Sequence, residues 1–325
     1  MERESQTSIV TGAAPSTRRA VGPGPANEVE RGVLMQIGSN AHRDLFVDTF
    51  LEGHRRYEPA DLNWPELSSG HLELLRGLPF WTHAREFESA AGPMISAVAK
   101  ELADERIREG FELQAYEESR HARLVDHMIG LYDLPAEPYK AQVVSNPIAE
   151  FIHFGFEECL DSFGAFGLFA LARESEILPD PIFEIFDNVM REESQHIVFF
   201  INWYAHHQAN QGPLQNWLRV PKSLWHYGRA VLQIADLVRD DDAEEGADFI
   251  ITGAQAFVDD LSPRLVIETC LAENRRRLAT FDQRLLAPRF IPALARVAGN
   301  ALKLVPGSLG AAPRPPQKSE TPRAA

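Results

Sequence analysis

Residues 117–121 read Glu-Glu-Ser-Arg-His, and residues 192–196 read Glu-Glu-Ser-Gln-His. The same pentad, Glu-Glu-Ser-x-His, therefore occurs twice in the chain, 75 residues apart. A single Glu-x-x-His inside a charged helix is common and carries little information. Its repetition in two segments that both have helical periodicity indicates a shared chemical role, and the rest of the sequence can be interpreted outward from these two segments.

The second glutamate and the histidine of each pentad fall on the apolar face of a helical wheel. Around the first pentad this face includes Phe111 and Val125, and around the second it includes Val189 and Phe200. Burial of a carboxylate among such side chains is costly unless a cation compensates its charge. A glutamate and a histidine three residues apart on a helix can bind one metal ion together. The sequence thus predicts four metal ligands: Glu118, His121, Glu193 and His196.

The chain is predicted to be all-α, because the alternating β-branched runs and tight turns of strands are missing. Hydrophobic periodicity predicts four long helices. They cover about 81–102, 103–131, 147–175 and a segment from about 180 to 207. Shorter helices are expected at about 40–57 and 64–79, and three or four more are expected between 213 and 305.

The connections between the long helices predict their topology. The first and second are joined almost directly, as are the third and fourth, so each pair should form an antiparallel hairpin. About 15 residues separate the second helix from the third and can span ~50 Å when extended. That reach exceeds the ~38 Å length of a 25-residue helix. Two hairpins joined by one long crossover are typical of a ferritin-like four-helix bundle.

This topology suggests a division of the chain into five parts. Residues 1–28 are expected to be a disordered leader, and residues 29–80 an N-terminal helical extension. The ferritin-like di-metal bundle should cover 81–208, and a C-terminal helical extension packed on it should cover 209–305. A disordered tail, 306–325, would follow.

The bundle needs one further carboxylate from each of its other two helices. On the first helix Glu88 shares a face with apolar residues, whereas Glu86 lies with polar ones, so Glu88 is the expected ligand. On the third helix Glu158 lies on the Phe-rich face and is preferred, with Glu157 as the alternative. Four carboxylates and two imidazoles suit iron or manganese better than a structural zinc site.

The paired pentads resemble those of ferritin-like di-iron carboxylate proteins, a superfamily that includes bacterioferritins, rubrerythrins, multicomponent monooxygenases and acyl carrier protein desaturases. The resemblance covers about residues 81–207. It implies that Glu117 and Glu192 hydrogen-bond the metal-bound histidines across the bundle and orient them. The chain departs from the oxygenase and desaturase pattern in the short interval from Glu118 to Glu158 and in Gln195, where Arg is usual.

The resemblance implies a cofactor of two iron ions, or of manganese and iron, and O2-dependent chemistry. We therefore expect a di-iron oxygenase or hydroxylase of a small apolar organic substrate, supplied with electrons by a ferredoxin or flavin reductase. One alternative is a ferroxidase or peroxidase that handles iron or peroxide. Another is a non-catalytic helical interaction protein. About 90 helical residues beyond the bundle favour the oxygenase over a minimal ferritin subunit.

Composition excludes several other classes of protein. The 325-residue chain has a formal net charge of −15, which argues against nucleic-acid binding. Two cysteines rule out a disulfide scaffold and fit the cytoplasm, and no apolar run reaches the ~18 residues that span a bilayer. An apolar stripe in 289–305 is expected to pack on the bundle, with membrane-surface contact as the alternative. Both a monomer and a homodimer are compatible with the sequence.

Overall fold

The computed structural model describes residues 35–78, 81–141, 143–239 and 262–303. Within these ranges the chain forms nine α-helices and one short 3-10 helix, and no strand. The all-α class expected from the sequence is confirmed for this part of the chain. The predicted leader, 1–28, and the predicted tail, 306–325, lie outside the described residues.

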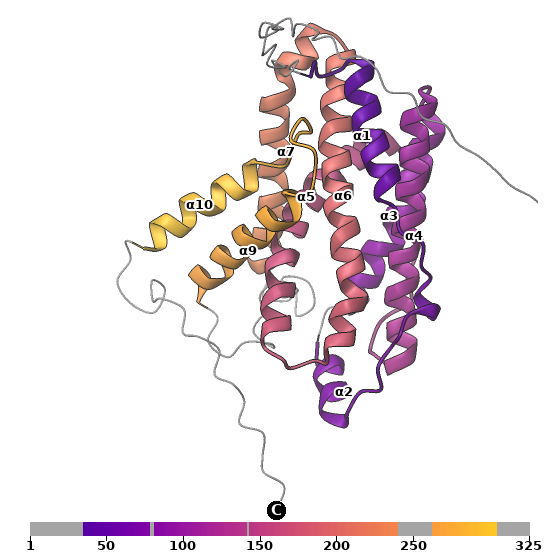
Figure 1. Ribbon diagram of the computed structural model, residues 1–325, viewed down its shortest axis with the longest axis vertical. Coiled ribbons are helices and arrows are strands. Elements are labelled where there is room, and N and C mark those ends of the chain that lie inside the picture. Colours follow the sequence, from indigo (N-terminus) through magenta and orange to yellow (C-terminus); the bar gives the residue numbers. More distant parts are fainter. Residues whose placement is uncertain (1–34, 79–80, 142, 240–261, 304–325) are drawn as a thin grey trace, which may run out of the picture. The chain divides into compact units, whose positions relative to one another are not determined.

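Four long helices form the centre of the molecule (Figure 1). They are α3 (Trp81–Glu101), α4 (Glu105–Tyr132), α5 (Pro147–Glu174) and α6 (Asp180–Asn210). Their ends lie within a few residues of the sequence-based prediction. Helix α3 packs against α4, and α5 packs against α6. Further contacts join α3 to α5 and α4 to α6, so side chains from all four helices can meet in one interior.

Local sequence explains where these helices begin and end. The Asp104 carboxylate accepts hydrogen bonds from the backbone N–H groups of Arg106 and Ile107 and caps α4, which leaves only three residues between α3 and α4. Helix α4 ends at Asp133, which adopts a left-handed conformation (φ 52°). Asn146 caps α5, and Pro147 occupies its first turn. The crossover therefore runs from residue 133 to residue 146.

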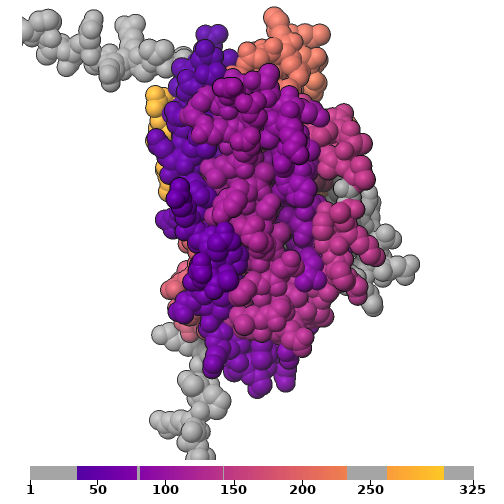
Figure 2. Space-filling view, turned by 90° about the vertical axis from the view of Figure 1, so that its right-hand side faces the viewer, coloured from indigo at the N-terminus to yellow at the C-terminus, as the bar shows by residue number. Residues whose placement is uncertain are grey.

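The remaining elements surround this group. Helix α1 (Asn40–Gly53) contacts α4 and α6, and Figure 2 shows the N-terminal elements, in indigo, along the left-hand side of the view beside the purple atoms of the helices that follow. A 3-10 helix (Pro59–Asp61) and α2 (Ser69–Arg76) follow. Both α1 and α2 are shorter than predicted. The chain turns to extended backbone at His54 before Pro59, and α2 begins only after its cap, Ser68.

Three further helices are described after α6. They are α7 (Pro213–Arg239), α9 (Pro263–Leu278) and α10 (Phe290–Leu302). All three contact α5. The closest approach is at Gly167, where an added Cβ would lie 2.7 Å from the Cα atom of Cys270 on α9. A glycine at this position lets the two backbones approach to a distance that no other residue permits.

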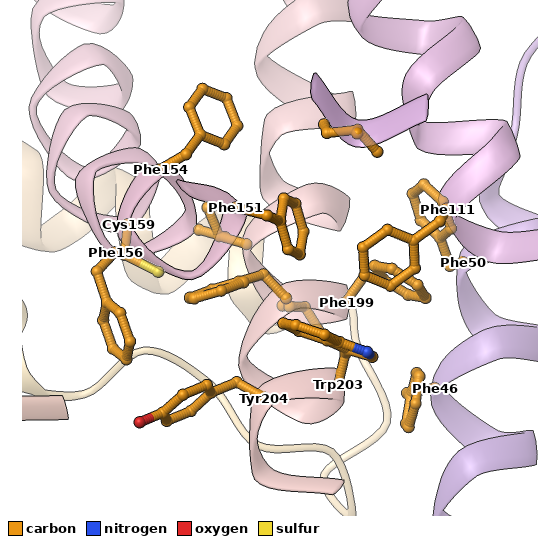
Figure 3. Close-up of a cluster of buried hydrophobic side chains, with 14 of the residues drawn as sticks. Phe46, Phe50, Phe111, Phe151, Phe154, Phe156, Cys159, Phe199, Trp203 and Tyr204 are labelled. Atoms are coloured by element: carbon orange, nitrogen blue, oxygen red, sulfur yellow. The ribbon is translucent and has the colours of Figure 1, made fainter. Parts of the chain in front are cut away.

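The main core is aromatic (Figure 3). Phe111 packs against Phe151, Phe199 and Trp203 with ring centroids 4.8–5.4 Å apart, so α4, α5 and α6 meet through one set of rings. Phe50 of α1 joins this set through Phe199, at 4.7 Å. Aromatic pairs at these separations contribute about 0.5–1.5 kcal/mol beyond the area they bury.

Candidate metal centre

The structure brings together the four residues at the centre of the two pentads. One ligand-type atom from each of Glu118, His121, Glu193 and His196 lies within 4.8 Å of the others. All four side chains are buried. Helix α4 supplies the first glutamate–histidine pair and α6 the second, so the three-residue spacing within each helix places both side chains on the same interior face.

Each histidine ring is oriented by a glutamate of the other helix. The Nε2 atom of His121 lies 2.9 Å from Glu192 Oε2, and the Nε2 atom of His196 lies 3.0 Å from Glu117 Oε2. An ionised carboxylate can only accept a hydrogen bond, so Nε2 of each ring must carry the proton. The Nδ1 atoms therefore face the interior of the cluster.

The two Nδ1 atoms are surrounded by carboxylate oxygens. His121 Nδ1 lies 3.0 Å from Glu193 Oε1, and His196 Nδ1 lies 3.1 Å from Glu118 Oε1. Neither approach has the alignment of a hydrogen bond, and both Nδ1 atoms lack a hydrogen-bond partner, as does Oε2 of Glu193. Buried polar atoms without partners are rare in native proteins. Here they converge on one point, which is the arrangement that a cation would satisfy.

Helices α3 and α5 each add a carboxylate beside this group. Glu88 Oε2 lies 3.7 Å from His121 Nδ1, and the Glu88 side chain is 19% exposed. Glu158 is buried, and its Oε2 atom has no hydrogen-bond partner. Glu157, the alternative to Glu158, instead lies 3.1 Å from His153 Nε2. On this geometry Glu158 is better placed than Glu157 to serve the cluster.

The pKa values of the clustered carboxyl groups are shifted in opposite directions. Burial and the nearby charge of Glu193 raise the pKa of Glu158 well above its usual value, and burial is the main cause that raises the pKa of Glu88 to about 8. Burial also opposes ionisation of Glu193, but its electrostatic interactions with His121 and His196 outweigh burial and lower the pKa of Glu193 well below its usual value. In the metal-free protein, protons on Glu88 and Glu158 thus reduce the buried negative charge.

A second layer of contacts holds Glu192 and Glu117. Glu192 is fully buried and accepts hydrogen bonds from Arg120 Nη2 at 2.8 Å and from the Tyr57 hydroxyl at 2.9 Å, in addition to the one from His121. Glu117 Oε1 lies 2.6 Å from His54 Nδ1. Helical spacing gives no indication of His54 or Tyr57, because both lie in the extended segment after α1 and meet their partners only in the folded chain.

Gln195, which stands where Arg is usual in the oxygenase and desaturase pattern, also contacts the backbone at the end of α1. Gln195 Nε2 donates a hydrogen bond to the carbonyl oxygen of Gly53 at 3.2 Å, and Arg191 Nη2 donates to the same oxygen at 2.7 Å. On the other helix Arg120 Nη1 donates to the carbonyl oxygen of Arg55 at 2.9 Å. Polar side chains from α4 and α6 therefore hold in place the segment after α1, which contacts Glu117 and Glu192.

The donor set suits a metal ion. Carboxylate oxygens and neutral imidazole nitrogens are ligands of iron, manganese and zinc, and the absence of thiolates disfavours a structural zinc site. Glutamates orient the rings from behind through Nε2, so the Nδ1 atoms face inward and become metal ligands once they lose their protons. The buried Glu/His group of this structure could therefore hold a metal ion.

Comparisons with protein-family models, with curated proteins and with solved structures find no match to this chain. In the described ranges, no helix combines the length and the apolar character needed to cross a membrane.

Proposed function

We propose that this protein is an O2-dependent di-iron oxidoreductase, an oxygenase or hydroxylase of a small apolar organic substrate. Its cofactor would be two iron ions, held by Glu118, His121, Glu193 and His196 with Glu88 and Glu158. Electrons for each turnover would come from a ferredoxin or a flavin reductase.

The single observation that carries this proposal is the pair of inward-facing Nδ1 atoms without hydrogen-bond partners, set among four carboxylates. The arrangement of helices supports it. Hairpins α3–α4 and α5–α6, joined by the crossover at 133–146, correspond to the ferritin-like bundle in which each helix supplies ligands to a dinuclear site. We therefore assign residues 81–208 to a ferritin-like di-metal bundle.

The residues around the cluster have separable roles in this proposal. Glu117 and Glu192 accept the Nε2 protons of His196 and His121 and so keep both Nδ1 atoms available as ligands. Arg120 and Tyr57 donate hydrogen bonds to Glu192 and hold it in place. Phe50 packs edge-on against the His196 ring at 5.8 Å and joins the cluster to the aromatic core, which excludes water. Two bound Fe(II) ions would supply two electrons together to O2.

The first test is metal stoichiometry after anaerobic loading with Fe(II) and removal of excess ions. We expect about two iron ions per chain for the wild type, and loss of at least one ion in Glu118→Ala and in Glu193→Ala. Glu86→Ala and Glu112→Ala are matched controls, because these two glutamates lie on α3 and α4 but are exposed. Unchanged iron content in both ligand variants would refute the site.

The second test is O2 consumption by the loaded protein with a reductant and a panel of apolar organic compounds. Substrate-dependent O2 uptake with oxidised product would support the oxygenase. Rapid O2 uptake that depends only on added Fe(II), together with assembly into a large oligomer, would instead assign the site to a ferroxidase. Metal binding with neither activity would leave an interaction protein stabilised by its metal.

A further inference from the structure

Helix α7 exposes a continuous stripe of large apolar side chains. They follow one another at intervals of one to seven residues and are 45–74% exposed. They are Leu214, Trp217, Val220, Leu224, Trp225 and Leu232, and we call them the α7 face. The stripe runs from Leu214 to Leu232, 19 residues, or about 27 Å of helix at a rise of 1.5 Å per residue. Exposed apolar patches of such continuity mark interaction surfaces rather than ordinary surface residues.

The α7 face is exposed although other side chains of α7 are buried against the rest of the protein. Tyr227 is buried and contacts Phe156 of α5 and Phe290 at the start of α10, with ring centroids 4.8 and 5.0 Å apart. Ala230 is buried on the same side. Helix α7 is therefore anchored to α5 and α6, and the α7 face is the side directed away from the protein.

Helix α10 repeats this pattern next to α7. Leu294 and Val297 are 46% and 67% exposed, whereas Ile291 is buried. The apolar stripe in 289–305, which the sequence predicted to pack on the bundle, is therefore only partly covered by protein. Both α7 and α10 contact α5 rather than α3 and lie on the same side of the central helices, linked through the Tyr227–Phe290 contact (Figure 1).

The charge of these two helices is opposite to that of the whole chain. Residues 213–239 include four basic residues and one acidic residue, Asp236, and residues 289–303 include three basic residues and no acidic one, in a chain of net charge −15. The basic residues are Arg219, Lys222, Arg229 and Arg239 in the first segment and Arg289, Arg296 and Lys303 in the second. An apolar stripe with Trp and Leu beside Lys and Arg is the composition of helices that lie in the plane of a bilayer surface.

We propose that the α7 face, with α10 beside it, binds the surface of an anionic phospholipid bilayer. The apolar side chains would enter the boundary between headgroups and acyl chains, where tryptophan is favoured, and the exposed basic residues Arg229, Arg289 and Arg296 would meet anionic headgroups. The acidic remainder of the chain would be repelled by the same surface, so binding would orient the protein. A second copy is a poorer partner, because pairing two α7 faces would bring basic residues of like charge together.

The test uses the full chain and two kinds of vesicle, phosphatidylcholine alone and phosphatidylcholine with phosphatidylglycerol. Flotation should recover the protein with the anionic vesicles only, and less of it as salt concentration rises. The chain has five tryptophans, all within the described ranges, and of these Trp217 and Trp225 are exposed. Their entry into the boundary region should shift tryptophan emission to shorter wavelength.

Two double variants separate the apolar and the charge contributions. We expect Trp217→Ser with Trp225→Ser to weaken vesicle binding about tenfold or more, and Arg229→Gln with Arg296→Gln, which removes two exposed charges, to weaken it comparably. The matched controls are Leu131→Ser with Val143→Ser, which removes two exposed apolar side chains elsewhere, and Arg106→Gln with Arg108→Gln, which removes two charges from α4. Both controls should bind vesicles as the wild type does. Circular dichroism checks that all variants fold.

Absence of binding to anionic vesicles at low salt would overturn the proposal, as would equal losses in the matched controls. Concentration-dependent dimerisation that is abolished by the two tryptophan substitutions, without vesicle binding, would assign the α7 face to a second copy of the chain. The inference is independent of the metal centre, since Glu118→Ala should bind vesicles normally. Failure of one proposal is therefore distinguishable from failure of the other.

Discussion

At the scale of single residues, the centre depends on a carboxylate that binds no metal itself. Glu192 is fully buried and accepts hydrogen bonds from His121, Arg120 and Tyr57. Glutamine at this position has one acceptor oxygen instead of two and directs an NH2 group toward groups that are themselves donors. The substitution preserves volume but disturbs the orientation of the His121 ring.

We therefore expect Glu192→Gln to weaken Fe(II) retention about 10- to 100-fold, the usual effect of removing a group that orients a metal-bound histidine. Competition with a chelator of known affinity measures this change. Glu184→Gln, an exposed substitution on the same helix, is the control and should retain iron as the wild type does. Equal retention by Glu192→Gln would show that His121 is not a ligand.

Asp161 gives a prediction about pH dependence. Burial is the main cause that raises its pKa from 3.8 to about 7, with the neighbouring Glu157 adding to the effect. The unfolded chain releases this proton near pH 4 and the folded chain only near pH 7, so the Asp161 contribution destabilises the fold increasingly as pH rises between those values. Asp161→Asn removes that contribution. The variant should be more stable than the wild type by up to about 4 kcal/mol at pH 8 and similar to it near pH 4.

Denaturant unfolding of both proteins across this pH range tests the Asp161 prediction. The difference in free energy of unfolding should grow as pH rises to about 7 and remain constant above it. A difference independent of pH would mean that Asp161 is ionised in the folded protein throughout the range.

At the scale of elements, the contact between α5 and α9 depends on Gly167. A Cβ atom there would lie 2.3 Å from Cys270 Sγ and 2.7 Å from the Cys270 backbone, so α9 would have to move away from α5. We expect Gly167→Ala to lower the free energy of unfolding by about 1–3 kcal/mol. Gly130→Ala is the control, because nothing lies within 4 Å of a Cβ at Gly130 on α4. Alanine favours a helix, so the control should be neutral or up to about 1 kcal/mol more stable.

The elements that periodicity can specify were predicted well, and the segments between them were not. The four central helices follow from apolar residues at helical spacing and from caps such as Asp104 and Asn146. The same spacing directed Glu118 and Glu193 to the interior, because burial phase is a local property of a helix. His54 and Tyr57 were missed because they approach partners 63 and 135 residues away through an extended segment, and extended backbone has no comparable periodicity.

Helix α10 illustrates a different limit of sequence analysis. Its apolar stripe is as regular as those of the central helices, yet Leu294 and Val297 are exposed while Ile291 is buried. Periodicity shows that a helix has an apolar face but not what covers that face. Only the packing of α10 on α5 and α9 in the folded chain separates the side chains that are covered by protein from those that are not.

At the scale of the whole molecule, metal binding and folding should be coupled through protons. Burial opposes protonation of His121 and His196, but the surrounding glutamates outweigh it and raise both pKa values well above 6.5. In the metal-free protein these imidazoles therefore carry protons that neutralise the carboxylates. A metal ion needs neutral imidazole nitrogens and must displace those protons, so metal affinity should rise with pH.

Thermal unfolding with and without Mn(II), which is stable in air, tests this coupling. A ligand present at 100 times its Kd stabilises the folded state by about 2.7 kcal/mol, which for a domain of this size corresponds to a rise in Tm of about 5–10 °C. We expect such a rise at pH 8 and a clearly smaller one at pH 6, where protons compete with the metal for His121 and His196. The variant Glu118→Ala with Glu193→Ala should show no rise at either pH. A rise in Tm of equal size at both pH values would mean that the imidazoles are already neutral in the metal-free protein. The buried negative charge would then be reduced by protons on Glu88 and Glu158 alone.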